Sequence, residues 1–366
     1  AVEEILAGCG AGRDDGIPPR PAADPGREFV CLSTSGSSGA PRLVARSARA
    51  VEANLRQVAA ALEVTAADRF LAVVPFWHAN GFSNCLLLPW WCGAGIVAMG
   101  RFVPRLALEK IRDQAVSVVI GSPFIFKALS QAAAAQPGAS HGLDGVRAWI
   151  SSGAALPAGL DERLRGQGIA VRQLYGSSET GTLCLSGPER REPGSVGRPV
   201  TGVELRIVDG QGGEAPPGAS GEIQVRSAAL FEGYVGDASN GPPRTTDGFY
   251  RMGDLGRRNA ADEVVVLGRS DAMINVSGVK VDPREVQAVL ESLPGIAQAL
   301  VHGVEDAAGL TLIRALLVRE GEISTEEVLR YSRRQLAEYK LPRVVEFVDS
   351  IPQDLMGKTA RRLLEH

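Results

Sequence analysis

The chain has 366 residues, with 39 Lys or Arg against 42 Asp or Glu, so its formal net charge is −3. Hydrophobic residues make up 45% and charged residues 22%, which is typical of a globular chain that buries a core. The near-neutral balance provides no basic field for phosphate backbones, so nucleic acid is disfavoured as the principal partner. Chains longer than roughly 300 residues tend to divide, and we expect one large and one small domain.

The cysteines form no Cys-x-x-Cys pair and lie far in sequence from His141 and His302, which argues against a zinc cluster and a disulfide framework. No positively charged apolar signal opens the sequence, and we expect a cytoplasmic protein. The apolar stretch 70–100 is interrupted by proline, histidine and asparagine, so it predicts a buried strand-helix-strand unit and no membrane span. The five cysteines are Cys9, Cys31, Cys85, Cys92 and Cys184.

The first 27 residues are rich in proline and glycine and predict a linker-like segment, 1–27. From Phe29 onward, short apolar runs alternate with stretches of helical spacing. This alternation predicts a mostly parallel α/β sheet covered by helices on both faces. The predicted strands are 29–32, 70–74, 95–99, 116–120, 146–150 and 171–174, and the predicted helices are 48–62, 105–114, 124–135 and 158–165.

Beyond Gly194 the apolar runs are separated by Gly, Pro and Asp turns, which is typical of antiparallel hairpins and predicts a β-rich subdomain. The composition shifts again after Arg269. We expect a large domain at 28–270 and a small, mobile α+β domain at 271–366. The predicted strands here are 203–208, 221–226, 264–267, 298–303, 311–318 and 343–348, with a helix capped at Ser324 or Thr325 and Glu327 as its early acid.

The strongest local motif is Ser33-Thr34-Ser35-Gly36-Ser37-Ser38-Gly39-Ala40-Pro41-Arg42, directly after a predicted strand. Small residues allow main-chain N–H groups to converge on an anion, hydroxyls add donors, and Arg42 supplies a positive fork for phosphate oxygens. The motif is no Walker loop, because the Gly-Lys-Ser/Thr ending is missing. On this decapeptide alone, a flexible Ser/Gly linker is an equally good interpretation.

Five further segments lie in order along the chain: Ser151-Ser152-Gly153-Ala154-Ala155-Leu156, Tyr175-Gly176-Ser177-Ser178-Glu179-Thr180-Gly181, Tyr250-Arg251-Met252-Gly253-Asp254-Leu255, Gly268-Arg269-Ser270-Asp271 and Gly357-Lys358-Thr359-Ala360-Arg361. With the first motif they resemble the ANL superfamily of adenylate-forming enzymes, over residues 29–362. The resemblance implies that a carboxylate attacks the α-phosphate of ATP, which releases pyrophosphate. Neutralising charge is the main task of such a site.

The resemblance also implies individual roles. Glu179, with Ser178, would hold the α-phosphate and Mg²⁺, a hard cation suited to oxygen ligands, and Lys358 would bridge the substrate carboxylate and the α-phosphate. Taken singly, Glu179 could be a helix-capping acid, Asp254 a turn residue and Lys358 a solvated lysine. The implied ATP-binding residues are Thr34, Ser35, Gly36, Ser37, Ser38, Gly39 and Arg42 at the phosphates, Gly153, Ala154, Tyr175, Gly176, Ser177 and Ser178 around the adenine and α-phosphate, and Asp254 and Arg269 at the ribose.

Pro75-Phe76-Trp77-His78 resembles the aromatic-histidine segment of the family, whose histidine lies at the acyl pocket near the entry of the thiol. The alternative is a histidine satisfied inside an apolar run. We expect Asn80, Phe82 and Gly176 beside His78 in the acyl pocket. Residues 76–85 contain no acid to pair a substrate ammonium, so α-amino acids are disfavoured and an aryl or medium-chain acid is favoured.

In the family, the small domain rotates about a hinge that matches Asp271 and replaces Lys358 with a thiol for the second half-reaction. Gly278 would then give a pantetheine arm close approach to the backbone. The implied acceptor is CoA or the phosphopantetheine of an acyl carrier protein. The resemblance includes compact relatives such as o-succinylbenzoate-CoA ligase, but only 32 residues precede the first motif here. One wall of the large domain would then be exposed or covered by a second subunit, as in a homodimer.

Two other functions remain open. Gly138-Ala139-Ser140-His141-Gly142 matches the Gly-x-Ser-x-Gly of α/β-hydrolases, although it follows a helix and precedes a strand, which is the wrong context for a Ser140 nucleophile. A non-catalytic relative that binds nucleotide or acyl adenylate is the other alternative. The presence of Glu179, Asp254, Arg269 and Lys358 argues against it.

Overall fold

The computed structural model describes residues 26, 28–34, 42–135, 142–189, 191–236, 244–270, 273–276, 279–306 and 310–351. Its largest sheet has seven strands in the order β4-β3-β5-β6-β7-β8-β9, and the five from β4 to β7 are parallel. The antiparallel β8 and β9 complete it. The strands are β3 (Arg69–Ala72), β4 (Gly95–Ala98), β5 (Val118–Gly121), β6 (Ala148–Ser152), β7 (Val171–Ser177), β8 (Gly181–Leu185) and β9 (Arg198–Pro199).

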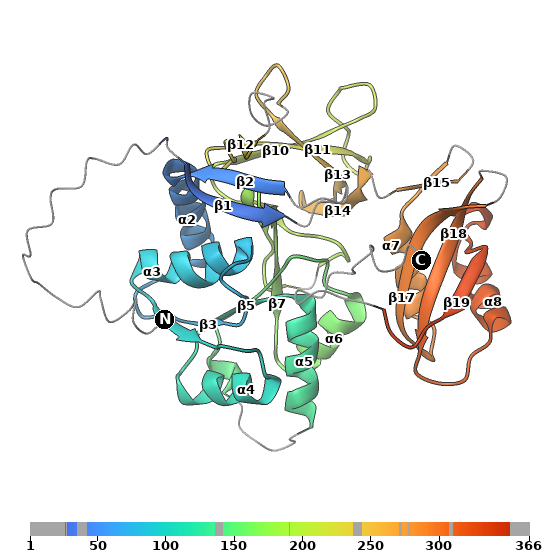
Figure 1. Ribbon diagram of the computed structural model, residues 1–366, viewed down its shortest axis with the longest axis horizontal. Coiled ribbons are helices and arrows are strands. Elements are labelled where there is room, and N and C mark those ends of the chain that lie inside the picture. The colour runs from blue at the N-terminus through green and yellow to red at the C-terminus, as the bar shows by residue number, and fades with distance from the viewer. Residues whose placement is uncertain are drawn as a thin grey trace, which may run out of the picture.

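Helices cover both sides of this sheet (Figure 1). One group, α4 (Pro104–Asp113), α5 (Pro123–Ala134) and α6 (Ala158–Gly166), packs against β3, β5, β6 and β7. The other group contains α2 (Ala48–Leu62), the π-helix η1 (Gly81–Leu87) and α3 (Leu88–Cys92). The strand-helix-strand unit expected over 70–100 is confirmed, and none of the described helices is long and apolar enough to cross a membrane.

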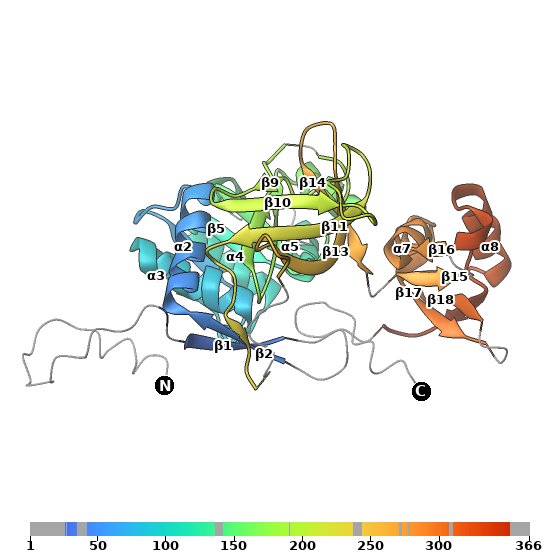
Figure 2. The same ribbon diagram turned by 90° about the horizontal axis from the view of Figure 1, so that it is seen from above.

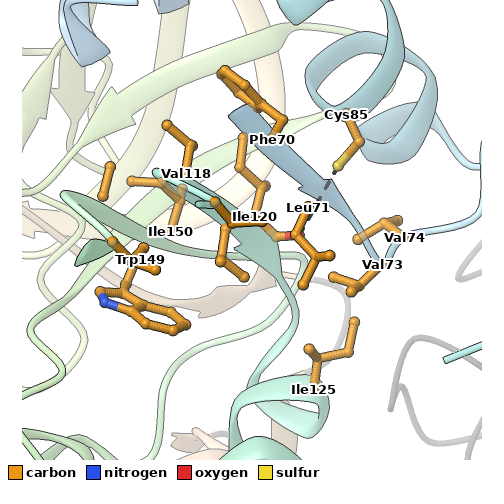
Figure 3. Packing of buried hydrophobic residues seen from close by; sticks show 14 of the residues in the cluster. Phe70, Leu71, Val73, Val74, Cys85, Val118, Ile120, Ile125, Trp149 and Ile150 are labelled. Atoms are coloured by element: carbon orange, nitrogen blue, oxygen red, sulfur yellow. Dashed lines mark hydrogen bonds between the residues drawn. The ribbon is translucent and has the colours of Figure 1, made fainter. Parts of the chain in front are cut away.

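The main core lies between the sheet and the helices (Figure 3). Strand β5 is buried on both faces, which explains its continuous apolar sequence. Cys85 on η1 is fully buried and reaches the carbonyl of Ile120 at 4.0 Å. Burial raises the pKa of this thiol to about 12, so Cys85 packs as a small apolar residue.

The first predicted strand does not join the parallel sheet. Strand β1 (Glu28–Thr34) pairs antiparallel with β2 (Arg42–Ser47), and β12 (Gly233–Tyr234) pairs with β2 in a separate three-stranded sheet. The sequence analysis missed β2, since its two arginines break the apolar pattern. The Ser/Gly-rich motif therefore connects two antiparallel strands.

The β-rich subdomain is a four-stranded antiparallel sheet in the order β10-β11-β13-β14. The strands are β10 (Val203–Val208), β11 (Gly221–Ser227), β13 (Tyr250–Arg258) and β14 (Val264–Arg269). Strand β13 was missed, because glycine, aspartate and arginine interrupt its alternation. Asp254 on β13 lies directly opposite Arg269 on β14.

The C-terminal elements gather at one end of the molecule, beside β13 and β14 (Figures 1 and 2). They are β15 (Ile274–Val276), β16 (Val279–Val281), α7 (Pro283–Glu291), β17 (Ile296–Glu305), β18 (Thr311–Arg319), α8 (Thr325–Gln335) and β19 (Val344–Phe347). A short 3-10 turn, Glu338–Lys340, lies between α8 and β19, and another, Leu143–Gly145, precedes β6 in the large domain. The predicted cap of α8 is a capping box: Glu327 N donates to Ser324 Oγ at 3.3 Å, and Ser324 N to the Glu327 carboxylate at 2.9 Å. The expected hinge, Asp271, lies outside the described residues.

A polar lock joins the amino ends of the parallel strands. Asp68 accepts hydrogen bonds from Arg147 Nε and Nη2 at 2.8 and 2.7 Å and from Ser117 Oγ at 2.7 Å. These three residues directly precede β3, β6 and β5. Arg147 lowers the pKa of the buried Asp68 carboxyl well below its usual range. The polar lock ties together the amino ends of these three strands.

Candidate active site

A cavity of about 600 Å³ lies at the carboxyl ends of β6 and β7, bordered by the β1–β2 hairpin and by β13 and β14. Carboxyl ends of parallel strands are the usual place for ligand sites in open α/β sheets. Five of the six motifs have described residues at this cavity, although these motifs are far apart in the chain. Predicted site residues that line it are Thr34, Arg42, His78, Gly153, Ala154, Tyr175, Gly176, Ser177, Ser178, Glu179, Asp254 and Arg269.

The phosphate motif is described only at its two ends. Thr34 ends β1 and Arg42 begins β2, and the Thr34 hydroxyl donates to the carbonyl of Arg42 at 3.2 Å. The guanidinium carbon of Arg42 lies 3.3 Å from the ring centroid of Tyr234 on β12. The predicted residues Ser35, Gly36, Ser37, Ser38 and Gly39 lie outside the described part of the chain.

Glu179 occupies the turn between β7 and β8. Its carbonyl accepts a hydrogen bond from Phe231 N at 2.8 Å, and its Oε1 accepts one from the Tyr234 hydroxyl at 3.1 Å. Burial, followed by the negative charge of Glu179, raises the pKa of Tyr234. Tyr234 therefore stays a donor at neutral pH and connects Arg42, through its ring, with Glu179.

The Glu179 turn rests on a buried polar layer. Asn54 Oδ1 on α2 accepts from Thr182 N at 2.7 Å. The buried Arg46 donates through Nη2 to the carbonyl of Ala229 at 2.6 Å, and burial lowers its pKa to about 10. Gly181, with φ +67°, has no room for a side chain, since a Cβ there would lie 2.4 Å from Asn54 Oδ1 and 3.1 Å from Arg46 Nη2.

The opposite side of the cavity is formed by Tyr175, Asp254 and Arg269. The Tyr175 hydroxyl donates to Asp254 Oδ2 at 2.5 Å, and Arg269 Nε lies 3.8 Å from Asp254 Oδ1. Burial raises the pKa of Tyr175 well above its ordinary value, and the adjacent Asp254 adds to the shift. A neutral phenol therefore holds one carboxylate oxygen of Asp254 and orients the other beside the guanidinium.

At the end of β6, Gly153 has φ +90°, a left-handed conformation that favours glycine. Gly153 and Ala154 both line the cavity. Backbone without bulky side chains allows a flat ring to approach closely. The adenine slot at these residues stays a prediction.

The aromatic-histidine segment is only partly at the cavity. His78 lines it, whereas Asn80 and Phe82 are not among its lining residues. Phe82 N donates to the carbonyl of His78 at 2.8 Å, an α-helical bond at the entry to the π-helix, and Asn80 Oδ1 accepts from Asn84 Nδ2 at 2.8 Å one turn on. The side-chain oxygen of Asn80 thus accepts a hydrogen bond from the same helical segment, and its role in an acyl pocket stays a prediction.

The donor set of the cavity fits Mg²⁺. No group of three or more His, Cys, Asp or Glu that could hold a metal occurs within the described ranges. Glu179 provides one carboxylate beside the hydroxyl of Ser178. Mg²⁺ is usually held by one or two carboxylates together with substrate phosphates and water, so a single acid beside a phosphate motif suffices.

Some predicted residues are not described, and some lining residues were not predicted. Lys358, Asp271 and Gly278, like Ser140, lie outside the described residues. Their roles stay predictions. The sequence analysis missed Tyr234, Tyr250 and Arg284, all of which line the cavity. Tyr250 was quoted within a motif without a role, whereas Tyr234 and Arg284 carry no local signal, because only β-strand pairing and domain packing bring them to the site.

The cavity gathers hydroxyls, carboxylates and arginines from several elements, which is the kind of polar lining that a phosphate-bearing ligand needs. The profile of AMP-binding enzymes matches residues 4–235, and that of the AMP-binding enzyme C-terminal domain matches residues 285–358. The chain belongs to this family, the adenylate-forming superfamily that the motifs indicated, and is an acid–thiol ligase by class.

Two curated relatives illustrate the similarity. Indoleacetate–CoA ligase of Aromatoleum aromaticum is 28% identical over 352 residues, which cover 95% of this chain and 68% of that protein. The fatty acid–acyl-carrier-protein ligase ScoC of Streptomyces coeruleorubidus is 30% identical over 386 residues, which cover 100% of this chain and 72% of that protein. The chain therefore spans only part of each relative's length.

Solved structures confirm the expected fold class, a large α/β domain with a β-rich subdomain and a small α+β domain. ATP-bound MatB from Rhodopseudomonas palustris superposes with a TM-score of 0.86 at 27% identity, covering 93% of this chain and 68% of that chain. The apo structure of MatB gives 0.72 at 26% identity with the same coverage. MenE from Bacillus subtilis, in complex with ATP and magnesium ion, gives 0.84 at 27% identity over 94% of this chain and 71% of that chain.

Proposed function

We propose that this chain activates a carboxylic acid with ATP to an acyl adenylate and then transfers the acyl group to a thiol. In the first step a carboxylate oxygen attacks the α-phosphorus, and pyrophosphate leaves with the electrons of the broken P–O bond. In the second step the thiol attacks the acyl carbon, and AMP leaves. The observation that carries the proposal is that described members of five of the six motifs, which lie in family order along the chain, line one cavity.

The proposed roles follow the chemistry of each side chain. Arg42 and the hydroxyls near Thr34 bind the β- and γ-phosphates, and Glu179, with Ser178, holds Mg²⁺ at the α-phosphate. Asp254 and Arg269 bind the ribose hydroxyls. The adenine lies against Gly153, Ala154 and Tyr175, with Gly176 and Ser177 beside them. When bound, Mg²⁺ supplies charge neutralisation at the phosphates.

Lys358 is proposed to bridge the two reacting anions in the adenylating orientation. His78 is proposed to lie at the thiol entry, Gly278 at the pantetheine arm and Asp271 at the hinge between domains 28–270 and 271–366. These proposals rest on the family pattern, together with the position of His78 at the cavity.

The substrate is proposed to be an aryl or medium-chain acid. Residues 76–85 hold no acidic side chain that could pair an α-ammonium group, and an unpaired buried ammonium is costly. The acceptor is CoA or a carrier-protein pantetheine, and the relatives named above include one ligase of each kind. The cytoplasmic location and the homodimer remain predictions.

The decisive experiment separates the two half-reactions. ATP–pyrophosphate exchange with a panel of aryl and medium-chain acids measures adenylation, and thioester formation from supplied acyl-AMP measures the second step. Lys358→Ala should remove exchange while leaving thioester formation largely intact, because its charge serves only the first step. Lys110→Ala, on α4 away from the cavity, is the matched control and should change neither rate.

Two results would count against the proposal. Equal loss of both half-reactions in Lys358→Ala would contradict the two-position mechanism. A folded wild-type protein that binds ATP yet shows no exchange with any acid would favour the non-catalytic alternative.

A further inference from the structure

Arg284 lies at the active-site cavity although it belongs to the C-terminal domain. Among the described residues that line the cavity, it is the one member that follows the expected hinge. It is the second residue of α7, after Pro283, and its main-chain N donates to the N-cap carboxylate of Asp282 at 2.9 Å. The capped helix start therefore fixes where the arginine side chain leaves the backbone.

The guanidinium of Arg284 lies next to Gly268, in the space that a side chain at that position would fill. A Cβ added to Gly268 would be 2.6 Å from Nη2, 3.3 Å from Cζ and 3.4 Å from Nε of Arg284. Gly268 immediately precedes Arg269 on β14, and Arg269 pairs across the strands with Asp254. Arg284 is thus placed at the Asp254 end of the cavity, where the ribose is proposed to bind.

The charge at this position suits a nucleotide. The ion-pair partner that the structure gives Arg284 among the described residues is Asp282, with Nε 3.5 Å from Oδ1, at the long end of hydrogen bonding. The Arg284 side chain keeps 43% of its surface exposed, so part of the fork can meet a ligand. A guanidinium is always charged and donates to ribose hydroxyl and phosphate oxygens alike.

We propose that Arg284 is a nucleotide-contact residue that the small domain contributes only in the adenylating orientation. The inference rests on the proposed function, since it presumes ATP at Asp254 and Arg269. It is supported by the superposition of the whole chain, which gives a TM-score of 0.86 with ATP-bound MatB and 0.72 with the apo structure of MatB. When the small domain rotates for thiol transfer, α7 moves with it, and Arg284 leaves the cavity.

The test compares Arg284→Ala and Arg284→Lys with wild type in both half-reactions. Loss of a charge-assisted contact should raise the KM for ATP in pyrophosphate exchange about tenfold in Arg284→Ala, with a smaller rise in Arg284→Lys. Thioester formation from supplied acyl-AMP should stay within about twofold of wild type in kcat, because the side chain has left the site in that state. Arg334→Ala, an exposed arginine in the last turn of α8, should behave as wild type.

Calorimetric binding of ATP keeps the two proposals distinguishable. Weaker ATP binding by Arg284→Ala supports the contact even if no acid in the panel drives exchange, an outcome that would sink only the proposed reaction. Unchanged KM and binding for ATP, or equal losses in both half-reactions, would overturn the role of Arg284. Thermal unfolding of both variants checks that the half-exposed substitution leaves the fold intact.

Discussion

Removing the Tyr234 hydroxyl should weaken productive binding of MgATP without disturbing the fold. Tyr234→Phe deletes the hydrogen bond to Glu179 Oε1, at 3.1 Å, and keeps the ring under Arg42, at 3.3 Å. A hydrogen bond to a charged group is worth about 1.5–3 kcal/mol. Since Tyr234 is only half-buried, we take the lower end, about 1.5 kcal/mol, which corresponds to an approximately tenfold higher KM for MgATP.

Tyr234→Leu should be worse, because it also removes the ring. The lost cation–π contact with Arg42 adds about 0.5–1 kcal/mol, or roughly a further two- to fivefold. Pyrophosphate exchange at varied MgATP measures both variants. The raised pKa of Tyr234 keeps it a donor, so the Phe deficit should be constant from about pH 6 to 9.

Tyr331→Phe is the matched control. Its hydroxyl lies 3.1 Å from Ser292 Oγ on the small domain, away from the cavity, and its loss should leave the KM for MgATP unchanged. A KM for MgATP in Tyr234→Phe equal to that of wild type would contradict a role for the hydroxyl, and equal impairment of Tyr234→Phe and Tyr234→Leu would contradict a role for the ring.

Two further substitutions test the supports of the site. Asp68→Asn should cost about 2–3 kcal/mol of unfolding free energy in urea at pH 7, with exchange unchanged, because it leaves the half-exposed Arg147 without its ion pair. The pKa of Asp68 is lowered in the folded protein, so the difference in unfolding free energy between wild type and Asp68→Asn should shrink as pH falls below about 4, where the unfolded chain takes up the proton. A difference that stays constant with pH would contradict this account. Gly181→Ala should lower the melting temperature and raise the KM for MgATP, since its Cβ would meet Asn54 Oδ1. Gly212→Ala, with φ +87° and no atom within 4 Å, isolates the backbone strain of roughly 1 kcal/mol, and equal losses in both would exclude the steric account.

The spacing of apolar residues was enough to predict the helices and strands whose burial follows a regular period along the chain. The predicted helix 48–62 coincides with α2, whose N-cap Ser47 accepts from Ala50 N at 3.2 Å, and the buried strands of the parallel sheet were found from their apolar runs. The β1–β2 pairing was not predictable in this way. An arginine in a short strand is normally expected at the surface. Arg46 is nevertheless buried, since its guanidinium donates a hydrogen bond to the carbonyl of Ala229, 183 residues away in the sequence.

The residues of the candidate site also fall into two groups, those predictable from local sequence and those placed only by the fold. Glu179, Asp254 and Arg269 lie in motifs whose order could be recognised, so their meeting at one cavity was expected. Tyr234 reaches Glu179 only because the two-residue strand β12 pairs with β2, and a two-residue strand has no periodicity to detect. Arg284 depends on how two domains lie together, which no sequence window contains.

The polar lock at Asp68, Ser117 and Arg147 secures the sheet at its amino edge, whereas the nucleotide cavity opens at its carboxyl edge. Residues that stabilise the fold and residues that line the cavity therefore lie at opposite ends of the same strands. Substitutions at the amino ends can therefore be used to change the thermal stability of the protein without touching the cavity. Natural variation at Asp68, Ser117 or Arg147 should likewise change the melting temperature before it changes ligand affinity.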